Sequence, residues 1–234
     1  GVVSMAMRSY NPSMRVAVIS DVHCAGPDDP IQAEFIGWLD ALEADGLWLL
    51  GDIFHWGWAF SGTFHVAIQP VVDALQRVQE RGIDVLFVGG NHDFAVATTL
   101  GRMGIEVRQA HHRSLDGRGV FVAHGDEADQ SVGYRLTQWL LRGRLFGWVI
   151  RMAGEVRGSW VLARLAGDQK TDLFEASDRR GRDWLKTQLV GETTLAMCGH
   201  FHLASRETHD EGEVVTLGAG GPRAVIWLKD GEVQ

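Results

Sequence analysis

The chain has 234 residues, of which 45% are hydrophobic, so it can bury one sizeable core and we expect a single domain over residues 1–234. Its formal net charge of −8 is opposite in sign to the surface of a general nucleic-acid binder, so nucleic acid is not expected as the main partner. Two cysteines exclude a disulfide framework, and we find neither an apolar run of membrane-spanning length nor a signal peptide before the first predicted strand. We therefore expect a cytoplasmic protein.

The first half of the chain alternates short apolar runs with segments of helical periodicity. Three runs rich in apolar and β-branched residues predict buried strands, at 15–20, 46–50 and 83–88. Two segments between them have apolar residues at helical spacing and predict helices, at 31–44 and 66–81. Gly82 follows the second helix and is expected to cap it. The order βαβαβ predicts a parallel sheet with right-handed crossovers.

The second half of the chain is patterned differently. Four further runs predict strands, at 119–123, 193–198, 214–217 and 224–228. The last two are expected to be antiparallel. Between the first and second of these strands, about 130–190 forms a long insertion that reads as mostly helical.

Side chains that bind metals or move protons directly follow five of the predicted strands. They are Asp21 and His23, Asp52, Asn91 and His92, His124, and His200 and His202. Gly89 and Gly90 end the run at 83–88 and allow the sharp turn that presents the residues after it. Ligands bind at the carboxyl ends of strands in α/β sheets. Any one of these residues alone would be an ordinary turn or surface residue, but five strand ends together predict one shared site.

The residue types in this set limit the chemistry. Carboxylates, an amide oxygen and imidazoles without cysteine suit divalent manganese, iron or zinc. This many donors exceeds the needs of one tetrahedral ion and fits two ions about 3.5–4 Å apart, the spacing of two-metal hydrolases. Two-metal chemistry of this kind acts mostly on phosphorus.

The ordered motifs Asp-x-His, Gly-Asp, Gly-Asn-His-Asp, His-Gly-Asp and Gly-His-x-His resemble those of the calcineurin-like metallophosphoesterases, from residue 15 to about 220. The resemblance implies an α/β fold, an αββα sandwich of two mixed β-sheets. It also implies the following roles: Asp21, His23 and His202 on one metal, Asn91, His124 and His200 on the other, Asp52 bridging both, and His92 beside the leaving-group oxygen. Asp93 is expected to support the ligands without binding metal.

One position departs from part of this family. Protein phosphatases of the family carry an Asp three residues after the bridging Asp, where it orients the catalytic His. This chain has His55 there, which argues against the protein-phosphatase subgroup. His55 is then either a substrate contact or a solvated loop histidine.

The insertion contains a basic, tryptophan-rich stretch from Tyr134 to Leu165. Six arginines and one glutamate give this stretch a net charge of +5, against −8 for the whole chain. One interpretation is an amphipathic helical hairpin packed on the core, with solvated arginines. The other is a cap over the metals that offers apolar surface to acyl chains and arginines to phosphates. The composition also suits peripheral contact with a membrane interface.

The cap interpretation resembles one bacterial branch of the family, the UDP-2,3-diacylglucosamine pyrophosphatases of lipid A biosynthesis. Those enzymes have a similar length, the same ordered motifs and a helical cap after His-Gly-Asp, but carry Arg where this chain has His92. The resemblance implies a lipid-linked nucleotide sugar as substrate, with UMP and the lipid sugar 1-phosphate as products. It implies manganese as the metal and peripheral contact with the cytoplasmic face of the inner membrane. Tyr134 and Arg135 are the cap residues that we expect to touch substrate, although no motif places them.

Two other functions stay open. A phosphodiesterase or nuclease for soluble nucleotides would use the same metal site, but the acid-rich composition and apolar insertion disfavour it. A non-catalytic scaffold would be expected to have lost ligands or the catalytic His, and this chain has lost none. Cys24 and Cys198 lie close to the ligands in sequence and are expected to be buried free thiols.

Overall fold

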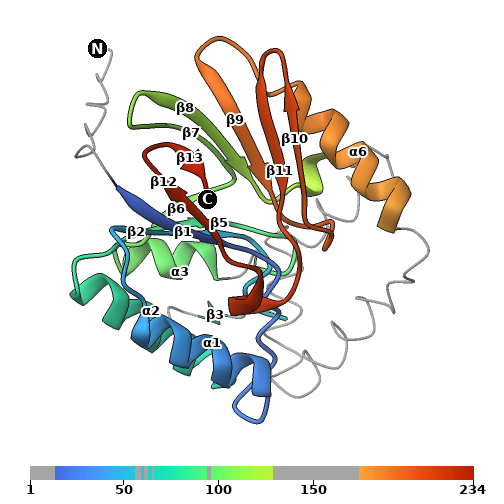
Figure 1. The fold of residues 1–234 in the computed structure, drawn as a ribbon. Coiled ribbons are helices and arrows are strands. Elements are labelled where there is room, and N and C mark those ends of the chain that lie inside the picture. The colour runs from blue at the N-terminus through green and yellow to red at the C-terminus, as the bar shows by residue number, and fades with distance from the viewer. Residues whose placement is uncertain (1–13, 56–58, 61–62, 65, 94–95, 129–173) are drawn as a thin grey trace, which may run out of the picture.

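The computed structural model describes residues 14–55, 59–60, 63–64, 66–93, 96–128 and 174–234. Two β-sheets lie against each other in this part of the chain, and helices cover their outer faces (Figure 1). This arrangement confirms the predicted α/β sandwich of two mixed sheets. β3 (Ala59–Phe60) and β4 (Thr63–Phe64) pair with each other in a small separate sheet.

The first sheet has six strands in the order β13-β12-β1-β2-β5-β6. Their bounds are β1 (Arg15–Ile19), β2 (Gly46–Leu50), β5 (Asp84–Val88), β6 (Glu106–Arg108), β12 (Ile226–Lys229) and β13 (Glu232–Val233). β1, β2, β5 and β6 are parallel neighbours, whereas β12 runs antiparallel to β1. Among the described residues, the helices of this half are α1 (Pro30–Ala41), α2 (Gln69–Glu80) and α3 (Ala97–Arg102). The βαβαβ prediction is therefore confirmed.

The ends of α1 and α2 differ slightly from the prediction, and for α1 local capping decides them. Asp29 caps α1 by accepting the N–H of Ile31 at 2.9 Å, so the helix begins at Pro30. It ends at Ala41 because Leu42 is extended. Gly82 takes a φ of +85° after α2 and donates its N–H to Gln79 at 2.8 Å, as expected of a C-terminal cap.

The second sheet has five strands in the order β10-β11-β9-β8-β7. Their bounds are β7 (Ala110–Leu115), β8 (Arg118–Ala123), β9 (Thr193–Cys198), β10 (Ser205–His209) and β11 (Gly212–Thr216). β8, β9 and β11 are parallel, and antiparallel β7 and β10 form the edges. The predicted strand at 214–217 thus pairs in parallel with β9 as well as antiparallel with β10, whereas the one at 224–228 lies in the other sheet. α6 (Phe174–Lys186) packs on the outer face of the second sheet.

One hydrophobic core lies between the sheets, and a larger one lies between the first sheet and its helices. Alternate residues of the first sheet, such as Val16 and Val18, face alternate residues of the second, such as Val120 and Val122. The intervening residues of β1, Ala17 and Ile19, pack toward the helices instead. Both faces of these strands are buried, which explains their unbroken apolar runs. No helix among the described residues is long and apolar enough to cross a membrane.

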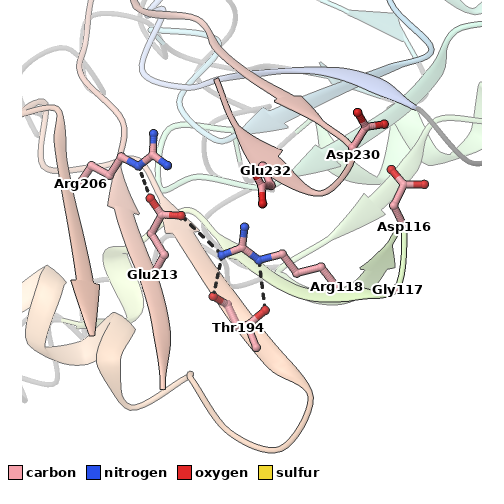
Figure 2. A pocket seen from close by; sticks show the side chains of 8 residues that line it. All are labelled: Asp116, Gly117, Arg118, Thr194, Arg206, Glu213, Asp230 and Glu232. Carbon is pink, nitrogen blue, oxygen red and sulfur yellow. Dashed lines mark hydrogen bonds and ion pairs between the residues drawn. The ribbon is translucent and has the colours of Figure 1, made fainter. Parts of the chain in front are cut away.

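Arg118 joins the two sheets at the end where β8 and β9 begin. It lines a surface pocket of about 530 Å³ together with Thr194 and Glu213 (Figure 2). Its guanidinium donates to Oγ1 and to the carbonyl of Thr194, both at 3.1 Å, and to the carbonyl of Gly231 at 2.9 Å. Gly231 lies in the β12–β13 turn of the first sheet, so one side chain holds both sheets.

We expect Arg118→Ala to lower the free energy of unfolding by about 2–4 kcal/mol, because several partly buried hydrogen bonds are lost and the buried Glu213 loses one of its two arginines. Urea denaturation at matched metal content measures this. Arg223→Ala is the matched control. Arg223 also donates two hydrogen bonds to a carboxylate, that of Glu34, at 3.0 and 2.9 Å, but its side chain is 79% exposed. It should leave stability unchanged. Equal losses in both variants would contradict the inter-sheet role.

Candidate metal centre

All five strand ends singled out in the sequence meet at one end of the sandwich. β1, β2 and β5 are neighbours in the first sheet, and β8 and β9 are neighbours in the second. Within each group the strands are parallel, so their carboxyl ends lie at the same edge. The structure brings together the side chains of Asp21, His23, Asp52, Asn91, His92, His124, His200 and His202.

The backbone of these loops is unusual. Seven described residues other than glycine have a positive φ, and five of them are predicted site residues: Asp21, His23, Asp52, His200 and His202. The other two, Asp116 and Asp230, each precede a glycine in a hairpin turn. Left-handed backbone is unfavourable for L-residues and persists where surrounding structure enforces it. Hydrogen bonds between the loops do so, since the N–H groups of Asp21 and His23 donate to the carbonyls of Gly51 and Asp52 at 3.0 Å.

Three motif glycines make room for ligands that come from other motifs. A Cβ on Gly51 would lie closer than 3.0 Å to the His124 ring, and a Cβ on Gly90 would collide with the Asp52 carboxylate. A Cβ on Gly199 would collide with Asp21 in the same way. The glycines therefore serve close approach between loops.

One group of donors consists of Asp21, His23 and His202, whose ligand atoms all lie within 4.8 Å of one another. Nε2 of His202 lies 3.3 Å from Nε2 of His23 and 3.3 Å from Oδ1 of Asp21. Oδ1 of Asp21 and Nδ1 of His23 are buried and have no hydrogen-bond partner among the described residues. The group is the one that the family resemblance assigns to the first metal.

A second group lies around Asp52, His124 and His200. Nε2 of His124 lies 3.3 Å from Oδ2 of Asp52, 3.1 Å from Oδ1 of Asn91 and 3.2 Å from Nδ1 of His200. Asp52 also shares a cluster with His23 and His92, so its carboxylate stands between the two groups. This is the position that a bridging ligand requires.

The chemistry of His124 shows that these residues fit a cation. Its Nδ1 lies 2.9 Å from the carbonyl of Leu50, and because a carbonyl only accepts, Nδ1 carries a proton. In the neutral ring Nε2 then directs a lone pair at the oxygen atoms of Asp52 and Asn91. Acceptors that converge in this way are stabilised by a positive charge between them, and a divalent metal ion supplies one.

The charges in the site also suit metal binding. Burial lowers the pKa of His23 and of His200 to about 4, so both rings are neutral near pH 7 and keep a lone pair for a ligand. Burial alone would raise the pKa of Asp52, but the charge of His124 outweighs it and the pKa is lowered. Burial lowers the pKa of His124 in turn, but the carboxylates of Asp52 and Asp21 outweigh it and raise that pKa well above normal. A metal ion between these groups would displace the proton.

His92 lies beside the two donor groups. Its Nδ1 is hydrogen-bonded to the main chain, and its Nε2 faces the site. Its Nδ1 is 2.6 Å from the carbonyl oxygen of His55 and therefore donates a proton to it. Its Nε2 faces Oδ2 of Asp52 at 3.9 Å. His55 is exposed, with its ring 6.0 Å from that of His92 and 6.2 Å from that of His23. The contact made by the His55 main chain was not predicted, because any residue type offers the same carbonyl.

The remaining predicted residues are placed as follows. Asp93 is fully buried, belongs to none of the three donor clusters, and accepts the N–H groups of Ile53 and Phe54. Burial and the charge of Asp52 raise its pKa to about 7. Cys24 and Cys198 are buried and free, as expected. Tyr134, Arg135 and the basic stretch lie outside the described residues.

A sequence model described as "Calcineurin-like phosphoesterase" matches residues 14–227. The chain belongs to the calcineurin-like phosphoesterase family. Family membership implies divalent metal ions, and the donor groups described above are of the kind that binds them.

Two groups of known proteins are similar to the chain. It is 32% identical over 117 residues to a UDP-2,3-diacylglucosamine hydrolase of Klebsiella pneumoniae, covering 48% of each protein, and 31% identical over 112 residues to that of Photorhabdus laumondii, covering 46% of each. The match thus spans about half the length of these curated relatives. Among solved structures, an archaeal phosphodiesterase matches with a TM-score of 0.49 and 12% identity, covering 94% of this chain and 98% of that one.

We expect Gly90→Ala to reduce phosphodiester hydrolysis by roughly 10²-fold, because the new methyl group would displace the carboxylate of Asp52. The variant should also bind less than the wild-type amount of metal after dialysis, measured by elemental analysis. Gly37→Ala is the control, since Gly37 lies in α1 with no atom within 4 Å of the added Cβ. A Gly90→Ala protein with full metal content and wild-type rate would show that the close approach is dispensable.

Proposed function

We propose that the protein is a two-metal hydrolase that cleaves the pyrophosphate of UDP-2,3-diacylglucosamine to UMP and the lipid sugar 1-phosphate. The observation that carries the chemistry is the convergence of two donor groups on Asp52. Support for the substrate comes from curated relatives named UDP-2,3-diacylglucosamine hydrolase, at about 30% identity over half the chain.

Asp21, His23 and His202 would hold one metal and Asn91, His124 and His200 the other, with Asp52 shared by both. Manganese fits this set of hard oxygen and imidazole donors, and iron or zinc fits it also. When bound, the two ions supply the positive charge that activates water and stabilises negative charge on phosphorus.

His92 would serve the leaving group. The carbonyl of His55 holds the Nδ1 proton, so a second proton taken up by the ring resides on Nε2, which faces the site. From there it can be donated to the oxygen that leaves phosphorus. The insertion would supply the lipid-binding part of the site, because its apolar and arginine-rich composition suits acyl chains and phosphates together, with Tyr134 and Arg135 as contacts and peripheral binding to the inner membrane.

A second candidate is a phosphodiesterase that acts on another nucleotide or phosphoester. His92 favours it, because the branch that acts on the UDP-diacyl sugar carries Arg at this position. The apolar, basic insertion favours the lipid substrate instead, and we place the lipid substrate first.

Product analysis separates the two candidates. With manganese present, the protein should release UMP from UDP-2,3-diacylglucosamine at least about tenfold faster than from UDP-N-acetylglucosamine, which lacks the acyl chains; a tenfold difference corresponds to about 1.4 kcal/mol of acyl-chain interaction, a small part of what burying such chains supplies. UMP is measured by chromatography, with metal-stripped protein as control. No UMP from the diacyl sugar, with good hydrolysis of a simple diester, would favour the second candidate.

Two substitutions test the roles within the site. Asp52→Ala should lose both metals and nearly all activity, since its carboxylate belongs to both donor groups. His92→Ala should keep its metals and lose about 10²–10⁴ in kcat, the usual contribution of a general acid. Metal analysis and steady-state kinetics on each variant measure this, and a wild-type rate in either would refute the assigned role.

A further inference from the structure

Asp93 anchors the residues that follow Asp52 in the chain. Asp93 is fully buried, and its two oxygens accept different main-chain N–H groups, Ile53 at 3.2 Å and Phe54 at 3.1 Å. A buried carboxyl group that accepts two amide N–H groups is a directional anchor for a loop, and the two bonds favour its ionised form against the effect of burial. Asp93 therefore fixes the two residues that lead into His55.

The segment is held on its other side as well. The N–H of His55 donates to the carbonyl of Cys24 at 2.9 Å, and the N–H of Cys24 donates to the carbonyl of Ile53 at 2.9 Å. These bonds form an isolated parallel bridge between Cys24 and Phe54. The carbonyl of His55 thus has a defined direction, and it is this carbonyl that accepts the Nδ1 proton of His92 at 2.6 Å.

These contacts close a ring, because Asp93 is the chain neighbour of His92. The ring runs from the Asp93 carboxylate through the amides of Ile53 and Phe54 to the His55 carbonyl and the imidazole of His92. We propose that Asp93 is a positioning residue for His92, and that it sets the direction of Nε2 through the main chain of His55. This inference rests on the proposed role of His92 as the group that protonates the leaving oxygen.

The ring explains how the chain manages without a carboxylate at position 55. A carboxylate side chain at that position can accept the hydrogen bond of a histidine directly. Here the neutral carbonyl of His55 accepts it, and the carboxylate of Asp93 acts only through the main chain before His55. A carbonyl holds the same tautomer of the ring without adding a negative charge beside it. The orientation of His92 then depends on a rigid main chain, which Asp93 supplies.

The test compares two diesters that differ in their need for a proton. Bis(p-nitrophenyl) phosphate has a good leaving group, whereas diphenyl phosphate has a poorer one that depends more on a general acid. In manganese-loaded enzyme, Asp93→Asn should slow diphenyl phosphate by about 10–100-fold and bis(p-nitrophenyl) phosphate by less than about threefold. His92→Ala should show the same ordering, and the double variant should lose little more than His92→Ala alone.

Asp45→Asn is the matched control. Asp45 also accepts a main-chain N–H, that of Arg15 at 2.8 Å, but it precedes β2 at the end of the sandwich away from the site. It should leave the ratio of the two rates unchanged. Equal slowing of both diesters by Asp93→Asn would indicate a merely structural role and overturn the inference, as would losses that multiply in the double variant.

A second measurement keeps the inference testable if Asp93→Asn does not fold. In zinc-loaded wild-type protein, ¹⁵N NMR of the His92 imidazole should show the proton on Nδ1; a ring with its only proton on Nε2 would overturn the proposal. Both diesters lack uridine, sugar and acyl chains, so the outcome is independent of the natural substrate. An unchanged ratio in His92→Ala would instead refute the general-acid role itself.

Discussion

The arrangement of this protein depends on one buried negative charge, the carboxylate of Asp52. It is 3% exposed and lies where the edges of the two sheets meet. One oxygen accepts the N–H of His92 at 2.9 Å, and the other faces His124 of the second sheet at 3.3 Å. A charge removed from water must be balanced by hydrogen bonds, opposite charge or metal. The nearby loops, their glycines and their left-handed residues all serve to bring such partners to it.

The two ends of the sandwich have different roles. At the end where β8 and β9 begin, Arg118 links the sheets through hydrogen bonds that carry no chemistry. At the other end, the loops after β1, β2 and β9 hold left-handed backbone conformations that would be unstable alone. The packed core between the sheets gives both ends a rigid base. A rigid base allows acceptors to converge on one place without relaxing apart.

Much of the fold could be predicted because its central strands are strongly patterned. β1, β2, β5, β8 and β9 were all anticipated, since strands buried on both faces are continuous apolar runs. β7 and β10 were missed, because these edge strands are partly exposed and rich in polar residues, so they lack an apolar run. α3 was missed because six residues carry too little periodicity to recognise. The ends of α1 and α2 differ from the prediction by one to three residues; Asp29 and Pro30 decide the start of α1, and the extended Leu42 decides its end.

The sequence by itself determined which donors the site contains and the order in which the strands deliver them, because residue type and strand position are both local properties. Only the tertiary structure decided which donors meet. Contacts such as Asn91 with His124, or Asp21 with the N–H of His200, join residues 33 and 179 positions apart. Such contacts depend on the register of two sheets and on the room left by glycines. The same holds for His92, whose tautomer follows from a main-chain carbonyl and its anchor at Asp93, a contact that leaves no trace in residue type at position 55.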